Sequence, residues 1–461
     1  MQLVKTMIRP LPDDHFPVHF LVRIPQSVCR KRQDATKEAF LQYGRHMVPI
    51  IYQVCDGDII EISQSVARFL HLPAESVPIH TGFNEKLNRL VIGPIFAVLT
   101  DRAHDGENPF GSLTPFYEEL ARYCRQNHLV FYVFSVEDVE GNSIVGYRWE
   151  KQRWHQKRCP LPDVVYNRIP TRRRETDEAI QSFFSHCRMR AIPYFNERFL
   201  SKWEVYLLLQ NSDTLAPSLP ETVLYRRTSD IEAMIQKHDH LFFKPIHGSL
   251  GKRIIQLRND GDTYAIRCST ATSEKEQTVS TTTLLSALKI ISARMTKNEY
   301  IIQQGIETVT YDGKPLDFRI LCNKDASGKW KITSVVARLS AEQQFVSNLA
   351  QGGLILPLKE ALAICFSRDG SHDTKRILME HSLAYAETVD RETKGIYGEF
   401  GIDLAIDNDG KPWLLEINTK PSKSDGTTRS HPFIRPSAKA IVNFALSLSG
   451  FQPESEGEMN G

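Results

Sequence analysis

The segment NDGKP (residues 408–412) is flanked by FGIDLAID (residues 400–407) and WLLEIN (residues 413–418). This stretch gives the strongest indication of the fold. Two apolar runs around an Asp-Gly pair predict a β-hairpin. With Asp409-Gly410 as a two-residue loop, Asp403 lies directly opposite Glu416. Because side chains alternate across a strand, Asn418 shares the face of Glu416. We therefore expect three oxygen-bearing side chains on one face of a ribbon whose other face is apolar.

These three side chains form a candidate metal site. Asp403, Glu416 and Asn418 supply two carboxylates and one amide oxygen. Such hard ligands suit Mg²⁺, which usually takes one or two protein carboxylates together with substrate phosphates. The alternative is a solvated polar face of the hairpin. That alternative explains less well why both acids and the amide fall on one face of otherwise apolar strands.

Bulk properties describe an ordinary globular protein. The chain has 461 residues, which suggests about three domains. Its formal net charge is +2, and its basic clusters are short, so no nucleic-acid groove is indicated. The eight cysteines are scattered singly without a Cys-x-x-Cys pair. This argues against a zinc site or a redox dithiol and favours a reduced, cytoplasmic compartment.

We expect no membrane segment. The first ten residues lack the apolar core of a signal peptide, and no uncharged run of about 18 apolar residues is present.

The N-terminal part of the chain divides into two predicted domains. The pattern of residues 1–88 predicts short strands and turns, and therefore a small β-rich accessory domain. No catalytic or binding motif is apparent in it. Residues 89–170 contain two apolar runs, at 90–99 and 129–134, around a helical pattern at 114–124. Strand, helix and strand in this order predict a βαβ unit and a parallel sheet. We assign residues 171–450 to a third domain and residues 451–461 to a disordered tail.

Two lysines lie in settings that suit phosphate. Lys202 follows Ser201 of a predicted capping box, near free backbone N–H groups at a helix start. A lone lysine there is more often solvated. Lys244 lies inside an apolar strand, where it must find an anion or bear a large desolvation cost. The glycine-containing segment after it is either a hairpin or a phosphate-binding loop, and Lys244 favours the loop. Its candidate ligand residues are His247, Gly248, Ser249, Gly251 and Lys252.

Further motifs follow in the second half of the chain. Gln303-Gln304-Gly305-Ile306 ends a predicted strand at a glycine. Asp317 and Arg319 share one face of the next strand, as a structural salt bridge or as a site with a phosphate-gripping arginine. Arg338 lies on another predicted strand, and a loop is predicted over residues 347–353.

These pieces, in this order, resemble an ATP-grasp domain, with residues 89–170 similar to the pre-ATP-grasp domain of such enzymes. The segments FKP (243–245), SNL (347–349), GG (352–353) and GID (401–403) look closest to the YheC/YheD endospore coat-associated family. Two departures are Gln304, where many relatives have Glu, and Lys420, where a small residue is common.

The resemblance implies an α/β fold (the α+β ATP-grasp fold) with ATP held between two subdomains. Lys202 and Lys244 would contact the α- and β-phosphates, and the loop from His247 to Lys252 would close over the triphosphate. Backbone around Gln303, Gln304, Gly305 and Ile306 would hold adenine, with Asp317 near the nucleotide. Arg319 and Arg338 would steady the γ-phosphate or an acylphosphate. Asp403, Glu416 and Asn418 would carry one or two Mg²⁺ ions, with Mn²⁺ as an alternative.

The implied activity is an ATP- and Mg²⁺-dependent carboxylate–amine ligase of the sporulating cell's cytoplasm. Its partners would be a carboxylate substrate, an amine from an amino acid, a peptide or a protein side chain, and spore coat proteins. Two alternatives are a non-catalytic nucleotide-binding coat or scaffold protein and a phosphotransferase of the same fold.

Overall fold

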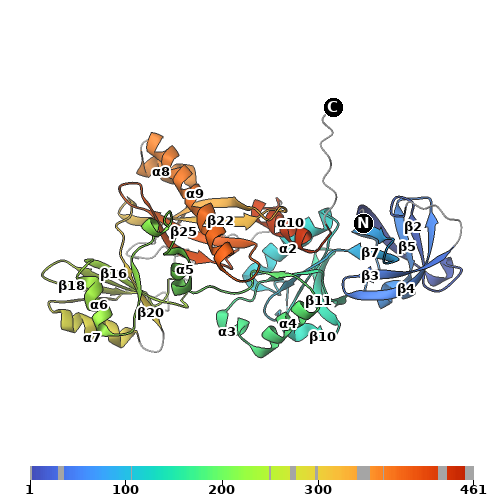
Figure 1. Cartoon of the computed structure of the whole chain (residues 1–461), viewed down its shortest axis with the longest axis horizontal. Helices are drawn as coiled ribbons and strands as arrows, with labels where there is room; N and C mark the ends of the chain where they lie inside the picture. The colour runs from blue at the N-terminus through green and yellow to red at the C-terminus, as the bar shows by residue number, and fades with distance from the viewer. Residues whose placement is uncertain are drawn as a thin grey trace. The chain divides into compact units, whose positions relative to one another are not determined.

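The computed structural model describes most of the chain (Figure 1). The described residues are 3–29, 36–104, 106–248, 251–269, 277–295, 299–339, 354–366, 368–423 and 433–451. No helix among them is long and apolar enough to span a bilayer. The predicted loop at 347–353 and the predicted tail from residue 452 onward lie outside these ranges.

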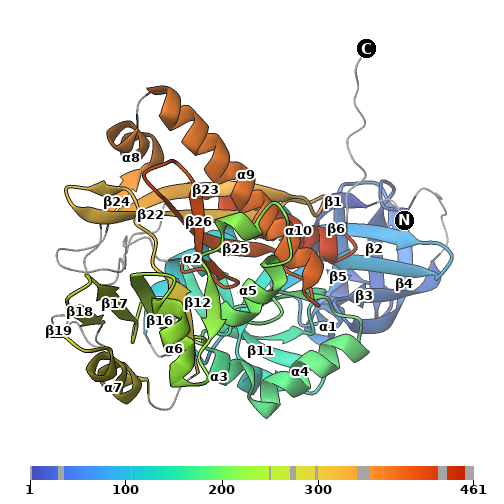
Figure 2. The same cartoon turned by 60° about the vertical axis from the view of Figure 1, so that its left-hand side comes forward.

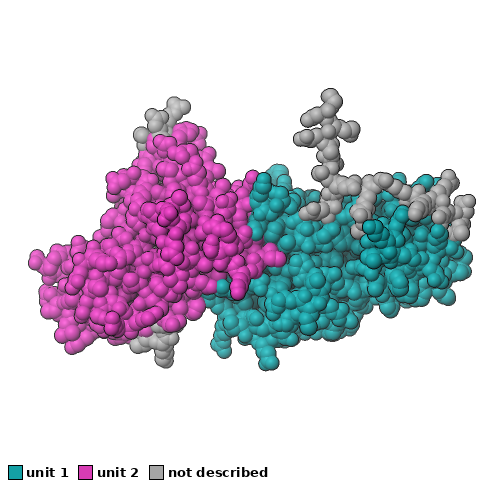
Figure 3. All heavy atoms as spheres, in the orientation of Figure 1, with its two compact units in different colours: residues 1–198, 324–329, 422–461 teal, residues 199–323, 330–421 magenta. Residues whose placement is uncertain are grey.

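The chain forms two compact units, drawn in different colours in Figure 3. Unit 1 contains residues 1–198, 324–329 and 422–461, and unit 2 contains residues 199–323 and 330–421. Unit 1 is therefore discontinuous in sequence.

Unit 1 begins with a closed seven-stranded barrel (Figure 2). Inward-facing residues such as Leu41, Ile60 and Ile92 are fully buried and fill it. Three of its strand pairs are parallel and join segments far apart in the chain. In spatial order its strands are β1 (Val4–Leu11), β5 (Ile59–Ser63), β2 (Leu21–Pro25), β4 (His46–Cys55), β3 (Lys37–Tyr43), β7 (Arg89–Gly93) and β6 (Val77–Asn84), with η1 (Asp13–His15) and α1 (Gln64–Phe69) in the connections.

The second part of unit 1 is a seven-stranded mixed sheet. Its strands β9, β8, β13 and β14 are parallel, as the βαβ pattern predicts. The path runs β10 (Val139–Glu140), β11 (Ser143–Glu150), β9 (Val130–Phe134), β8 (Ile95–Leu99), β13 (Val164–Asn167) and β14 (Tyr194–Phe195), and β12 (Arg153–Pro160) pairs with β11. The helices of this part are η2 (Gly111–Leu113), α2 (Thr114–Gln126), η3 (Val136–Asp138), α3 (Arg172–Glu175), α4 (Glu178–Met189) and α10 (Pro436–Leu448).

The two faces of this sheet are covered by different helices. Phe444 of α10 packs against Phe195, whose ring stacks on Phe96. Phe183 of α4 packs against Phe134, which belongs to the core of the opposite face together with Ala97. The last helix of the chain thus completes unit 1, although by sequence we assigned it to the domain of residues 171–450.

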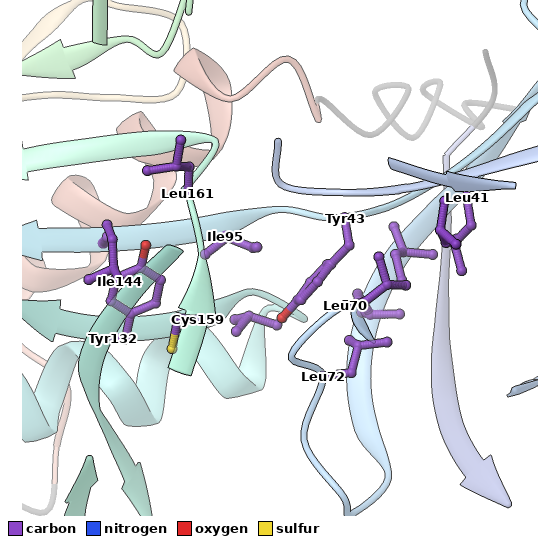
Figure 4. Packing of buried hydrophobic residues seen from close by; sticks show 14 of the residues in the cluster. Leu41, Tyr43, Leu70, Leu72, Ile95, Tyr132, Ile144, Cys159 and Leu161 are labelled. Atoms are coloured by element: carbon purple, nitrogen blue, oxygen red, sulfur yellow. The ribbon is translucent and has the colours of Figure 1, made fainter. Parts of the chain in front are cut away.

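One sequence expectation was wrong in detail. The apolar run at 90–99 is two strands in two different sheets, β7 of the barrel and β8 of the mixed sheet. Pro94 separates them, because it has no N–H group to donate to a continuing ladder. One continuous core spans this junction, and in Figure 4 Tyr43 of the barrel lies between Leu41 on its own strand and Ile95 of the sheet.

Unit 2 contains two sheets. The first is six-stranded and carries Leu241, Phe243 and Ile302 in its apolar core. Its order is β15 (Thr222–Leu224), β20 (Tyr300–Gln304), β16 (His240–Pro245), β17 (Ile255–Asn259), β18 (Tyr264–Cys268) and β19 (Gln277–Thr281), and its helices are α6 (Thr228–Ile235) and α7 (Leu284–Arg294).

The second sheet of unit 2 contains the hairpin of residues 400–418. Helix α9 packs on β23, β25 and β26 of this sheet (Figure 2). The order is β24 (Leu354–Pro357), β23 (Trp330–Leu339), β22 (Lys314–Lys324), β25 (Glu399–Ile406) and β26 (Pro412–Asn418), with β21 (Thr310–Tyr311) paired to β22. The helices around it are α5 (Lys202–Leu209), η4 (Ala216–Ser218), α8 (Leu358–Cys365) and α9 (Arg368–Glu392).

The hairpin pairs Asp403 with Glu416 as predicted, but through two changes that cancel. Three residues rather than two form its loop, because Asp407 and Lys411 are hydrogen-bonded and Gly410 takes a φ of 82°. A bulge between Asp403 and Leu404 then restores the register. In consequence Leu414 lies in the core of this sheet, while Leu415 beside the bulge is half-buried.

Candidate functional site

Lys202 begins helix α5 behind the predicted capping box. Ser201 Oγ accepts from the Glu204 N–H at 3.1 Å, and the Glu204 carboxylate accepts from the Ser201 N–H. The Lys202 ammonium donates to Gly248 O at 2.7 Å and to Glu416 Oε1 at 2.9 Å. It therefore links the glycine-containing loop of the first sheet to the hairpin of the second sheet within unit 2.

Lys244 points from β16 toward the neighbouring strand β20. Its Nζ donates to Gln303 Oε1 at 2.5 Å and lies 5.4 Å from the centre of the Phe242 ring. Burial, and then the charge of Lys202, lower the pKa of Lys244 to about 8, against a smaller opposing effect of Glu416. Among the described residues, the hydrogen-bond acceptor of this ammonium is a neutral amide, so its positive charge is incompletely compensated.

The loop after β16 is partly described. His247 and Gly248 form a turn in which the Gly248 N–H donates to Pro245 O at 3.1 Å. Gly251 and Lys252 are described, and Gly251 takes a φ of 67°. Ser249 lies outside the described residues.

The segment after β20 is held closely by the protein. The Gln304 N–H donates to Glu221 O at 2.8 Å, and Gln304 Oε1 accepts from the Glu221 N–H at 3.1 Å. The Gly305 N–H donates to His240 O at 2.7 Å. A Cβ atom on Gly305 would lie 2.2 Å from the His240 ring, so this position admits glycine alone without rearrangement. Ile306 follows, and its N–H donates to none of the described residues.

Asp403 is the centre of a charged cluster on the second sheet. Arg319 lies opposite it on β22, where the guanidinium donates to both carboxylate oxygens. Arg338 Nη2 is 3.0 Å from Asp403 Oδ2. Burial raises the pKa of Asp403, but the charges of Arg319 and Arg338 outweigh it, so this pKa lies below its ordinary value.

Asp317 belongs to the same cluster through Arg338. Arg338 Nε donates to Asp317 Oδ1 at 2.6 Å, so this one guanidinium bridges two buried carboxylates. Burial alone would lower the pKa of Arg338, yet Asp403 and Asp317 raise it above its ordinary value. Asp317 and Arg319 share a face as expected, but each pairs with a residue of another strand.

The three residues predicted as metal ligands lie on one face of β25 and β26. Gly401 pairs with Asn418 and Asp403 with Glu416, so the three oxygen-bearing side chains alternate correctly to share that face. Glu416 Oε1 is occupied by Lys202, while its Oε2 accepts from no described residue. Within the described ranges no group of three or more His, Cys, Asp or Glu side chains could hold a metal. A metal here would use the Asn418 amide as its third protein ligand, a set that fits Mg²⁺.

Unit 2 thus brings most of the predicted residues into two connected groups. Lys202 joins the loop after Lys244 to Glu416, and Asp403 joins Arg319 to Arg338, which in turn holds Asp317. Lys420 Nζ, for which the sequence predicted no role, lies 4.7 Å from the centre of the Phe199 ring.

All eight cysteines are free, and six are buried. Thr222, Glu221 and His240 were missed, because a single polar residue beside a short strand carries no motif.

The comparisons with known proteins point to one family. A profile described as "YheC/D like ATP-grasp" matches residues 191–448. The endospore coat-associated protein YheD of Bacillus subtilis (strain 168) is 29% identical over 350 residues, covering 74% of this chain and 75% of that protein. The endospore coat-associated protein YheC of the same strain is 22% identical over 317 residues, covering 66% of this chain and 84% of that protein.

Among solved structures, D-alanyl-alanine synthetase A from Vibrio cholerae O1 biovar eltor is similar with a TM-score of 0.41 and 14% identity. The match covers 78% of this chain and 96% of that chain.

Proposed function

Because the chain belongs to the YheC/D-like ATP-grasp family, we propose that it is an ATP- and Mg²⁺-dependent carboxylate–amine ligase that acts through an acylphosphate. The observation that carries the proposal is a local excess of positive charge around Lys202 and Lys244. Lys202 and Lys244 face the single carboxylate of Glu416, and Lys244 is buried against a neutral amide. A polyphosphate is the ligand class that such a surplus favours.

The nucleotide would occupy the first sheet and its loop. Lys202 and Lys244 would contact the α- and β-phosphates, and the loop of residues 247–252 would cover the triphosphate. The N–H groups of Gln304 and Gly305 already donate within the protein, so adenine would be read by the Ile306 N–H and by nearby carbonyls. The Gln304 side chain would then keep its hydrogen bond to the Glu221 N–H, just before β15, and would not contact the base.

Asp403, Glu416 and Asn418 would hold one or two Mg²⁺ ions, or Mn²⁺. When bound, the metal would neutralise phosphate charge. Glu416 Oε2 would be available for that role, and release of Lys202 from Oε1 would free its ammonium for a phosphate oxygen. The same ion pair thereby supports both assignments.

The two arginines would have different tasks. Arg319 is the more exposed of the two side chains, at 19% against 10%, and would steady the γ-phosphate or the acylphosphate. Arg338 is committed to Asp317 and Asp403 and would keep Asp403 in place. Asp317 would therefore support the nucleotide site indirectly.

The reaction would take place in two steps. A substrate carboxylate oxygen attacks the γ-phosphorus, the bond to the bridging oxygen breaks, and ADP leaves. An amine then attacks the acyl carbon, phosphate leaves, and the nitrogen loses a proton. Neutralising and positioning charge are the main requirements of both steps.

The names of the relatives support a place in the sporulating cell. YheD and YheC are endospore coat-associated proteins, so we assign this chain to the cytoplasm of that cell, in association with the coat. A peptide or a coat protein side chain would then supply one substrate. The alternatives are a non-catalytic nucleotide-binding scaffold and a phosphotransferase.

The test is ADP release by purified protein with Mg²⁺-ATP and pooled amino acids, peptides and extract of sporulating cells, with mass spectrometry of the products. Glu416→Gln should lower turnover at least tenfold while thermal unfolding stays unchanged. Glu232→Gln, at an exposed position on α6, is the matched control and should retain full turnover.

The reaction products distinguish the three candidate functions. A mass gain from condensation establishes the ligase, whereas a phosphorylated product establishes a phosphotransferase. Nucleotide binding without ADP release from any pool would favour the scaffold. Unchanged turnover in Glu416→Gln would overturn the metal assignment.

A further inference from the structure

A chain of three hydrogen bonds runs from strand β15 to Lys244. Thr222 Oγ1 donates to Pro220 O at 2.8 Å, Gln303 Nε2 donates to Thr222 Oγ1 at 3.0 Å, and Lys244 Nζ donates to Gln303 Oε1 at 2.5 Å. Thr222 and Gln303 are both buried. None of the sequence motifs includes Thr222.

Strand geometry explains why these side chains meet. Thr222 pairs directly with Gln303 across β15 and β20, so their side chains share one face of the sheet. On the other side of β20, Gln303 pairs with Phe242, two residues before Lys244. Lys244 is therefore a diagonal neighbour on the same face.

Donor and acceptor chemistry fixes the direction of the chain. The Thr222 hydroxyl has one hydrogen, which it gives to Pro220 O, so toward Gln303 it can act as an acceptor alone. The Gln303 atom facing it must then be the NH₂ group, and the amide oxygen must face Lys244. An ammonium can donate but cannot accept, so the opposite amide orientation would place two donors together.

We infer that Thr222 is a positioning residue for Lys244, because it orients the Gln303 amide so that its oxygen holds the ammonium at the phosphate site. This inference rests on the proposed nucleotide site, in which Lys244 contacts phosphate. The low pKa of Lys244 agrees with it, since a cation with so little compensation depends strongly on one well-aimed acceptor.

The experiment measures Mg²⁺-ADP affinity by titration calorimetry. Thr222→Val keeps the shape but removes the hydroxyl, and should weaken binding about five- to tenfold, the range expected for one hydrogen bond. Thr222→Ser should restore binding to within twofold of wild type. Thr278→Val, at an exposed threonine on β19 of the same sheet, is the matched control and should change nothing.

A double-mutant cycle shows whether the effect passes through Lys244. In a Lys244→Met background, Thr222→Val should change ADP affinity less than twofold, because the side chain to be positioned is gone. Gln303→Met gives a second background in which Thr222→Val should likewise add nothing. Thermal unfolding of each variant reports whether it is folded.

The outcomes are distinct. Wild-type affinity in Thr222→Val, equal losses in all backgrounds, or failure of Thr222→Ser to restore binding would each overturn the role of Thr222. Absence of ADP binding by the wild-type protein would overturn the nucleotide site itself, and this inference with it.

Discussion

Arg319 and Asp403 lie directly opposite each other on β22 and β25, and Arg319 Nη2 donates to Asp403 Oδ2 at 2.8 Å. Asp403 is also in contact with Arg338, so this one buried carboxylate is shared by two guanidinium groups, the second of which also pairs with Asp317. The proposed metal ligand is therefore also the electrostatic centre of the second sheet.

Asp403→Asn should destabilise the protein by about 3 kcal/mol, because it leaves two largely buried cations without their shared anion. Equilibrium denaturation in urea measures the loss. Asp409→Asn, in the hairpin loop, provides the control and should stay within about 0.5 kcal/mol of wild type. Equal stability of the two variants would mean that the cluster contributes little to folding.

The two arginines should respond differently to lysine. Arg338→Lys should cost about 3 kcal/mol, because a lysine cannot bridge Asp317 and Asp403 as a guanidinium does. Arg319→Lys should cost less, since an ammonium still reaches Asp403, yet it should lower ADP release at least tenfold. Urea denaturation and the ADP assay separate the two effects. The reverse ranking in stability would contradict the assigned roles.

Nucleotide affinity should depend on pH through Lys244. Its pKa of about 8 means that the charged, phosphate-binding form is lost as pH rises above 8. ADP binding should therefore weaken by up to about tenfold per pH unit between pH 8 and 9.5. In Lys244→Arg the guanidinium stays charged, so the steep part of the profile should disappear. Parallel profiles for the two proteins would show that another group titrates.

Gly305→Ala should disturb the segment after β20. The new methyl group would lie 2.2 Å from the His240 ring, so we expect a loss of about 2 kcal/mol and weaker ADP binding. Combining it with His240→Ala removes the obstruction, so the penalty of Gly305→Ala should shrink by at least about 1 kcal/mol in that background. Additive losses in urea denaturation would exclude this steric cause.

Local contacts of this chain could be predicted from its sequence. The capping box at Ser201 and the pairing of Asp403 with Glu416 both follow from short-range rules. The hairpin loop was one residue too short in the prediction, because Asp407 caps the loop with its own side chain, accepting from the Lys411 N–H at 2.9 Å. The bulge compensated for this error, so the facing pair was right for an incomplete reason.

Contacts between distant segments were not predictable in the same way. The barrel closes through parallel pairs such as β1 with β5, whose strands lie some fifty residues apart in the sequence. Neither strand has a local sequence pattern that indicates which strand it pairs with. The same limit applies to charges. Sequence placed Asp317 beside Arg319, but the partner of Asp317 is Arg338 of the following strand.

The discontinuity of unit 1 has a consequence for synthesis on the ribosome. Helix α10 covers the Phe96 and Phe195 face of the mixed sheet, but in the sequence all of unit 2 lies between that sheet and this helix. During translation, the strands of unit 1 are synthesised first, and more than two hundred further residues must be added before helix α10 is synthesised. We therefore expect the part of this aromatic surface that lies under α10 to stay exposed on the nascent chain for many seconds, a state that chaperones for exposed apolar segments would bind.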